Sequence, residues 1–130
     1  MSATTRILAV ALGLLGLGTP VIAHHAFSSE YDENKVVTFK GTVTKVEWTN
    51  PHARFFIDVV NQDKSVTSWS FELASPNSLT REGWDRHTLT VGDAISVSGF
   101  AAKSGKTMAS TRSVTTADGK SLFGGTQGIQ

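Results

Sequence analysis

Two adjacent histidines, His24 and His25, follow a stretch with the anatomy of a secretory leader, and their chemistry depends on where that leader is cut. Residues 7–17 are apolar, and residues 21–23 (Val-Ile-Ala) form a small-residue cleavage sequence. We expect cleavage after residue 23, which makes His24 the new N-terminus. A free α-amine beside an imidazole offers two nitrogens to one transition-metal ion, so the cut creates a candidate metal site.

A third nitrogen ligand could come from His52, which follows a Pro turn at the start of a predicted strand and would therefore be held rigidly. With the amine and imidazole of His24 it would form a T-shaped site of the histidine-brace type, and His25 could contribute its own imidazole instead. Such ligands suit Cu(II), Ni(II) and Zn(II), with Cu(II) bound most tightly, so copper is the candidate cofactor. The alternative is an exposed N-terminal end that binds nothing.

A second constellation combines an aromatic ring, an amide, an imidazole and a guanidinium around one turn. It consists of Trp48, Asn50, His52 and Arg54. These groups suit a sugar or a small anionic ligand. In the alternative interpretation, the tryptophan packs in the core, the asparagine caps the turn and the histidine bonds to backbone. Strand alternation places His52 opposite Phe55 and Ile57, which favours an exposed imidazole.

The elements that must position these groups are strands, because apolar residues alternate with period 2. A change of phase in the first strand predicts a bulge near Thr44-Lys45. Ser75 and Pro76 predict the N-cap and first residue of a short helix that ends at Gly83, with Leu79 directed at the core. Trp69 and Trp84 are also expected in the core. The predicted strands cover residues 36–48, 52–60, 66–73, 94–100 and 107–116.

Together these elements predict an all-β fold, a small five-stranded OB-like Greek-key barrel with one short helix between strands 3 and 4. An open β-sandwich is the alternative. The expected organisation is a cleaved leader (1–23), a polar lead-in (24–35), the barrel (36–123) and a flexible Gly-rich tail (124–130).

Composition excludes several classes of function. The chain has no cysteine, so disulfides, thiolate metal sites and cysteine nucleophiles are excluded. The leader contains one of the 12 basic residues, Arg6, and none of the 11 acidic ones, so the mature domain has no net charge with His neutral. A neutral domain lacks the basic field that nucleic-acid binding requires. The apolar stretch of the leader is too short to cross a bilayer and no second apolar stretch follows it, so we expect no membrane span after the leader is removed.

Six short segments carry a resemblance to a known family. They are His24–Ser28, Phe39–Val43, Trp48–His52, Glu72–Leu79, Arg81–Trp84 and Val91–Asp93. In these segments the chain resembles a family of small secreted bacterial proteins known as domain-of-unknown-function family 6152. The resemblance implies an exported domain of β-barrel type and implies no activity.

From these observations we expect a periplasmic or secreted bacterial module that binds a small ligand or a metal ion. The alternative is a protein-interaction module of the cell envelope, with neither metal nor substrate. We do not expect an enzyme, because there is no Gly-x-Ser-x-Gly elbow, no cysteine and no clear acid–base pair. A small copper-dependent redox enzyme would need a substrate as well as the metal site.

Overall fold

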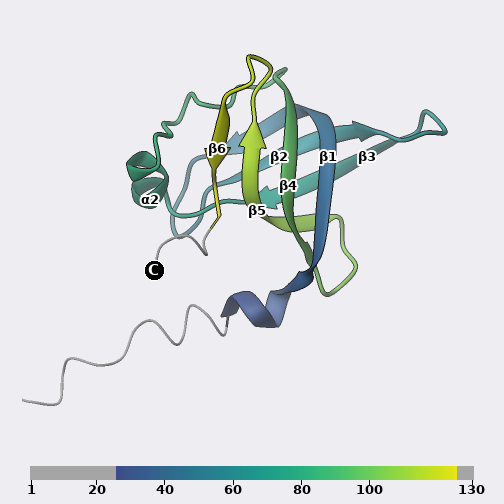
Figure 1. The fold of residues 1–130 in the computed structure, drawn as a ribbon, viewed down its shortest axis with the longest axis horizontal. Helices are drawn as coiled ribbons and strands as arrows, with labels where there is room; N and C mark the ends of the chain where they lie inside the picture. Colours follow the sequence, from purple (N-terminus) through teal and green to yellow (C-terminus); the bar gives the residue numbers. More distant parts are fainter. Residues whose placement is uncertain (1–25, 126–130) are drawn as a thin grey trace, which may run out of the picture.

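The computed structural model describes residues 26–125, which contain six strands and the helix α2 (Figure 1). Residues 26–30 are helical and lead directly into the first strand. The remaining elements are β1 (Tyr31–Glu47), β2 (Arg54–Val60), β3 (Val66–Glu72), α2 (Pro76–Arg81), β4 (Ala94–Ala102), β5 (Met108–Thr115) and β6 (Ser121–Phe123). The described residues are therefore predominantly β, with a short helix between β3 and β4, as the sequence predicts.

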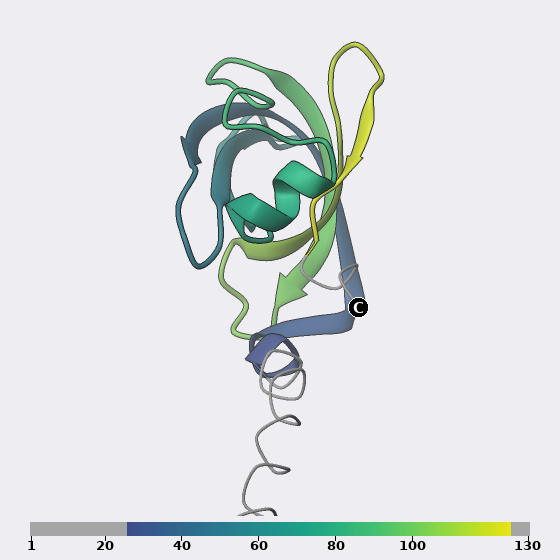
Figure 2. The same cartoon turned by 90° about the vertical axis from the view of Figure 1, so that its left-hand side faces the viewer.

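The strands form one sheet in the order β3-β2-β1-β4-β5-β6. Five of the pairings are antiparallel, and β3 makes an additional parallel pairing with β5 at Ser70↔Met108, Phe71↔Ala109 and Glu72↔Ser110. This pairing joins the first strand of the order to the fifth. Figure 2 shows the strands curving around α2. Among residues 26–125, no helix has the length and hydropathy needed to cross a bilayer.

The structure contains six strands where the sequence pattern predicts five. The additional strand, β6, pairs with β5 through Val114↔Leu122 and its two neighbours. The strand β6 has only three residues, of which Leu122 alone is buried. Three residues are too few to show an alternating pattern in the sequence. Gly124, the first residue of the predicted flexible tail, is buried and donates its backbone N–H to the Arg112 carbonyl at 3.1 Å. A side chain at this position would lie 2.7 Å from Leu73 Cδ2, so glycine permits the close packing.

The core lies on the face of β2 that the alternation predicts. In β2 the buried residues are Phe55, Ile57 and Val59, and the rings of Phe55 and Phe71 stack at 5.4 Å with an interplanar angle of 12°. The register of β1 on β2 shifts between Val43 and Lys45, which confirms the predicted bulge.

The two tryptophans that we expected in the core differ in burial. Trp84 is buried and donates its indole N–H to the carbonyl of Phe123 at 2.8 Å, which connects it to β6. Trp69 is only half-buried and packs on the edge of the core, with its ring 4.5 Å from that of Phe39.

The helix α2 has the predicted start and end. Ser75 is its N-cap, with the side-chain oxygen accepting from the Ser78 N–H at 3.3 Å, and Pro76 is the first helical residue. Leu79 is the buried residue of the helix. Gly83 follows with a φ of 91°, a left-handed conformation that glycine adopts without strain.

We predict that Ser75→Ala lowers the free energy of unfolding by about 1 kcal/mol, because the helix loses the acceptor for one of its free N–H groups. Urea unfolding measures the change as a shift in midpoint with an unchanged slope. Ser68→Ala, at an exposed position in β3, is the matched control and should have little effect. A similar loss in both variants would contradict a capping role for Ser75.

The helical residues before β1 are attached to the sheet by a second, smaller apolar cluster. Phe27, Tyr31 and Ala102 are buried together, and Phe100 and Met108 pack against them. The ring of Phe27 lies edge-on to that of Phe100 at 5.8 Å. The Lys103 N–H also donates to the Glu30 carbonyl at 2.8 Å. These contacts bring the start of β1 beside the end of β4 and the start of β5, below the sheet in Figure 1.

Candidate functional site: a carboxylate that joins three elements

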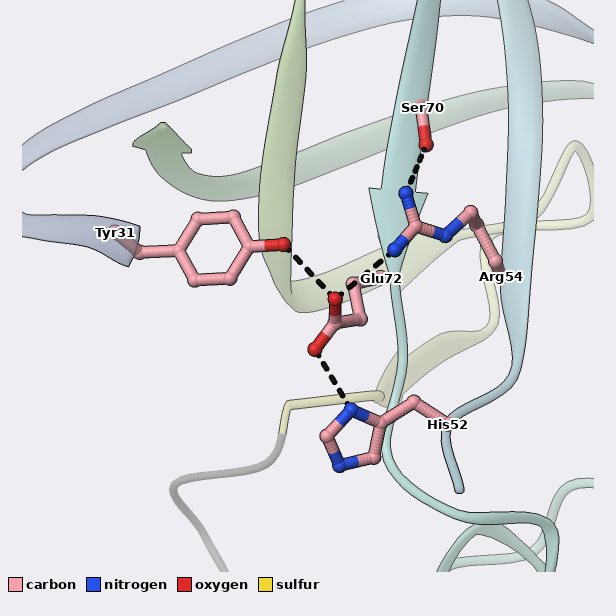
Figure 3. Close-up of polar contacts among 5 residues, drawn as sticks. All are labelled: Tyr31, His52, Arg54, Ser70 and Glu72. Atoms are coloured by element: carbon pink, nitrogen blue, oxygen red, sulfur yellow. Dashed lines mark hydrogen bonds and ion pairs between the residues drawn. The ribbon is translucent and has the colours of Figure 1, made fainter. Parts of the chain in front are cut away.

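Four polar side chains gather around the carboxylate of Glu72 at the end of β3 (Figure 3). We call this group the Glu72 cluster; its members are Tyr31, His52, Arg54, Ser70 and Glu72. The Glu72 side chain is 12% exposed, so its charge is largely withdrawn from water. A carboxylate in that position needs hydrogen-bond donors.

Both oxygens of the Glu72 carboxylate accept hydrogen bonds. Oε2 accepts from the Tyr31 hydroxyl at 3.0 Å and from Arg54 Nη2 at 3.1 Å, and Oε1 accepts from His52 Nδ1 at 2.8 Å. Arg54 Nη1 also donates to Ser70 Oγ at 3.0 Å. One side chain therefore connects the start of β1, the segment before β2, and β2 itself.

Strand geometry explains why four of these residues share a face. Arg54 lies directly opposite Glu72 in the register of β2 on β3. The Ala53 N–H donates to the Ala74 carbonyl at 3.0 Å, and the Leu73 N–H donates to the Ala53 carbonyl at 2.8 Å. These bonds extend the pairing beyond the start of β2 and the end of β3. Because alternate side chains point to the same face, residues 52 and 54 lie together across from 70 and 72. Ala53, between them, is buried on the opposite face.

Tyr31 reaches the cluster from the start of β1. Its side chain is buried in the small apolar cluster, and its hydroxyl is directed at Glu72. Burial raises the pKa of the Tyr31 phenol well above its usual range, and the Glu72 carboxylate raises it further. Tyr31 therefore remains protonated and acts as a hydrogen-bond donor at neutral pH.

His52 is the member of the cluster most accessible to solvent, with 46% of its side chain exposed. Its Nδ1 faces Glu72, and Nε2 lies on the far side of the ring in Figure 3. A neutral imidazole that donates from Nδ1 carries its lone pair on Nε2. That nitrogen can accept a proton, a hydrogen bond or a metal ion.

The structure brings together two of the four residues predicted to surround a ligand. His52 and Arg54 both bond to Glu72. Trp48 is half-buried and packs against the main core, and Asn50 is exposed next to a cis Asn50–Pro51 peptide bond. Neither takes part in the hydrogen bonds of the cluster. The alternative interpretation expected the imidazole of His52 to bond to a backbone group, whereas it bonds to the Glu72 carboxylate.

The other two predicted metal ligands, His24 and His25, lie outside the described residues. Within residues 26–125, no three His, Cys, Asp or Glu side chains come close enough together to hold a metal ion.

Sequence reasoning missed Glu72, Ser70 and the hydroxyl of Tyr31. The sequence contains one signal that points to Glu72 and Ser70. The loop between β2 and β3 pairs Val60 with Val66, and counting outward from that pair places Arg54 opposite Glu72. Opposite charges directly across a strand pair attract each other, so the register alone indicates the ion pair.

Comparison with known proteins assigns the chain to a family. No curated protein and no solved structure matches it. A family model described as a family of unknown function (DUF6152) matches residues 11–111, which is most of the 130-residue chain. The protein therefore belongs to this family of unknown function, the one that its sequence segments resemble.

Proposed function

We propose that this protein is an exported metal-binding module built on a small OB-like Greek-key barrel. The pairing order supports the barrel, since β1, β2, β3, β5 and β4 connect in a closed ring and α2 follows β3. The strand β6 is an addition to the edge of β5. The leader at residues 1–23 supports export to the periplasm or the medium.

The metal ligands in this proposal are His52 and the mature N-terminus, with His24 or His25. The observation that carries it is the 2.8 Å bond from His52 Nδ1 to Glu72, with Nε2 on the other side of an exposed ring (Figure 3). Histidines that bind metals almost always donate their other ring N–H to a carboxylate, a carbonyl or water. His52 has this arrangement, with Glu72 as the carboxylate.

The position of Tyr31 supports a contribution from the N-terminus. Its hydroxyl bonds to the same carboxylate as His52, and Phe27 holds the preceding helical residues against β4. The helical residues 26–30 therefore lead directly into a member of the cluster, and His24 precedes them by only two residues in the sequence. An amine and imidazoles favour Cu(II) over Ni(II) and Zn(II) in affinity, so copper is the proposed ion.

A second candidate function is protein interaction in the cell envelope, without metal. It is favoured by the tip of the β2–β3 hairpin, which projects from the sheet in Figure 1. Val60 and Val66 pair across this tip and are 69% and 58% exposed. This function would require neither His24 nor His52, so metal binding distinguishes the two candidates.

The test of the proposal is the thermal stability of the mature protein with Cu(II). A free ion at 100 times its Kd should stabilise the folded state by about 2.7 kcal/mol, which raises Tm by roughly 10 °C or more in a domain of this size. One extra glycine before His24, or His52→Ala, should abolish most of the rise. His87→Ala, at an exposed loop position, is the matched control and should retain it. No rise in the authentic protein, or equal rises with and without the added glycine, would contradict the proposal.

A further inference from the structure

We infer that Glu72 is a positioning residue, which fixes the tautomer and direction of His52 so that Nε2 is the nitrogen offered to a ligand. The inference about the tautomer concerns the metal-free protein. Its consequence for metal affinity rests on the proposed function above.

The first step is that the Glu72 carboxylate is itself fixed in place. Its Oε2 holds two donors from different elements, Tyr31 at 3.0 Å and Arg54 at 3.1 Å. Rotation of the carboxylate would break both bonds in a setting with little access to water. The exposed pair of Lys45 and Glu47 differs, because its side chains are 62% and 36% exposed and water can replace their 2.6 Å contact.

The second step is that a fixed acceptor selects one form of the imidazole. The Oε1 atom of a carboxylate has no proton to donate, so it can only accept a hydrogen bond. When the imidazole of His52 is neutral, its single ring proton must therefore be on Nδ1. A histidine free in water prefers the other tautomer, with its proton on Nε2. Glu72 thus directs the lone pair of His52 away from the cluster and toward solvent. A carboxylate acceptor also makes the opposite nitrogen a stronger metal ligand.

The third step concerns charge. Arg54 lies in the same cluster, and an unpaired guanidinium there would repel a metal ion. It donates instead to Glu72 and to Ser70, so one negative and one positive charge balance each other beside His52. The neutral imidazole can then accept a cation without facing an uncompensated positive charge.

A near-isosteric variant, Glu72→Gln, provides a sharp test. The amide oxygen of the glutamine should remain with the two donors, Tyr31 and Arg54. The NH₂ group would then face His52 Nδ1 and require a lone pair on that atom. The proton of His52 should therefore move to Nε2, which removes the metal-binding lone pair. Glu82→Gln is the matched control, because it makes the same chemical change at an exposed position after α2, outside the cluster.

The measurement is long-range ¹H–¹⁵N correlation NMR of the metal-free mature protein, with His52→Ala used to assign the ring. We expect the proton on Nδ1 in the wild type and in Glu82→Gln, and on Nε2 in Glu72→Gln. Exposed His87 provides the internal reference. A wild-type His52 that has its proton on Nε2, or a mixture like that of His87, would overturn the inference without use of any variant.

Calorimetric titration with Cu(II) tests the consequence for binding. Loss of a carboxylate partner of this kind should weaken the affinity for Cu(II) about 10–100-fold in Glu72→Gln, and Glu82→Gln should bind as the wild type does. Equal affinity in wild type and Glu72→Gln, despite inverted tautomers, would overturn the role of Glu72 in metal binding and leave the proposed function standing. No binding by the wild type would overturn the proposed function, and the NMR result would still decide whether Glu72 positions His52.

Discussion

Replacing Phe55 with alanine should lower the free energy of unfolding by about 3–5 kcal/mol, the cost of removing a large ring from a packed core. Phe55 is fully buried, and its ring stacks on that of Phe71. The loss would take away the ring's own burial and its contact with Phe71 and would leave a cavity. A change of this size is a large part of the stability of a small domain.

Phe56→Ala is the matched control, because it makes the same chemical change one residue farther along β2. Phe56 lies on the opposite face and is only partly buried, with Lys45 Nζ 5.4 Å from the centre of its ring. An exposed cation–π contact is worth about 0.5–1 kcal/mol, so we expect less than half the loss seen at Phe55. Urea unfolding of both variants measures the difference. Equal losses would contradict the division of β2 into a core face and an outer face.

The alternation in β2 explains how much of the fold is predictable from sequence. Ala53, Phe55, Ile57 and Val59 recur every second residue, which predicts that they share one strand face, and all four are buried. The bulge in β1 was predictable for the same reason, since an inserted residue shifts the phase of a period-2 pattern. Local patterns of this kind depend only on neighbouring residues.

The elements that the sequence did not predict depend on contacts between distant segments. The strand β6 has three residues and gains its place by pairing with β5 and by accepting the indole N–H of Trp84 on the Phe123 carbonyl. Neither contact leaves a periodic trace in the sequence.

The candidate site also contains some residues that are predictable from the sequence and others that are not. His52 and Arg54 were identified because they flank one turn and share a strand face. Tyr31 falls in the predicted polar lead-in (24–35), 41 residues before its partner Glu72. The ring of Phe27 packs on Phe100 and lies 5.5 Å from the ring of Tyr31, so tertiary packing holds the start of β1 near Glu72. A single carboxylate that gathers donors from three elements is therefore visible only in the folded structure.

Stability should fall as the pH rises above about 10, because of Tyr31. In the unfolded chain its phenol ionises near pH 10. In the folded protein burial, and then the carboxylates of Glu72 and Glu30, raise the pKa of Tyr31, and these outweigh the opposing effect of Arg54. Between the two pKa values the unfolded chain releases a proton that the folded protein retains. The contribution of Tyr31 to the free energy of unfolding should therefore be fully present below pH 10. Above pH 10 the free energy of unfolding should decline by up to about 1.4 kcal/mol per pH unit.

Tyr31→Phe separates this effect from the titration of lysines, which remain in both proteins. The variant loses the hydrogen bond to Glu72 at every pH, but its stability should depend less steeply on pH above 10 than that of the wild type. Because Tyr31 is the only tyrosine of the chain, ultraviolet absorbance of tyrosinate reports its ionisation directly. We expect no tyrosinate signal near pH 10 while the protein is folded, and its appearance together with unfolding at higher pH. A phenol that titrates near pH 10 in the folded protein would contradict its burial against Glu72, and with it the anchoring of the start of β1 at the cluster.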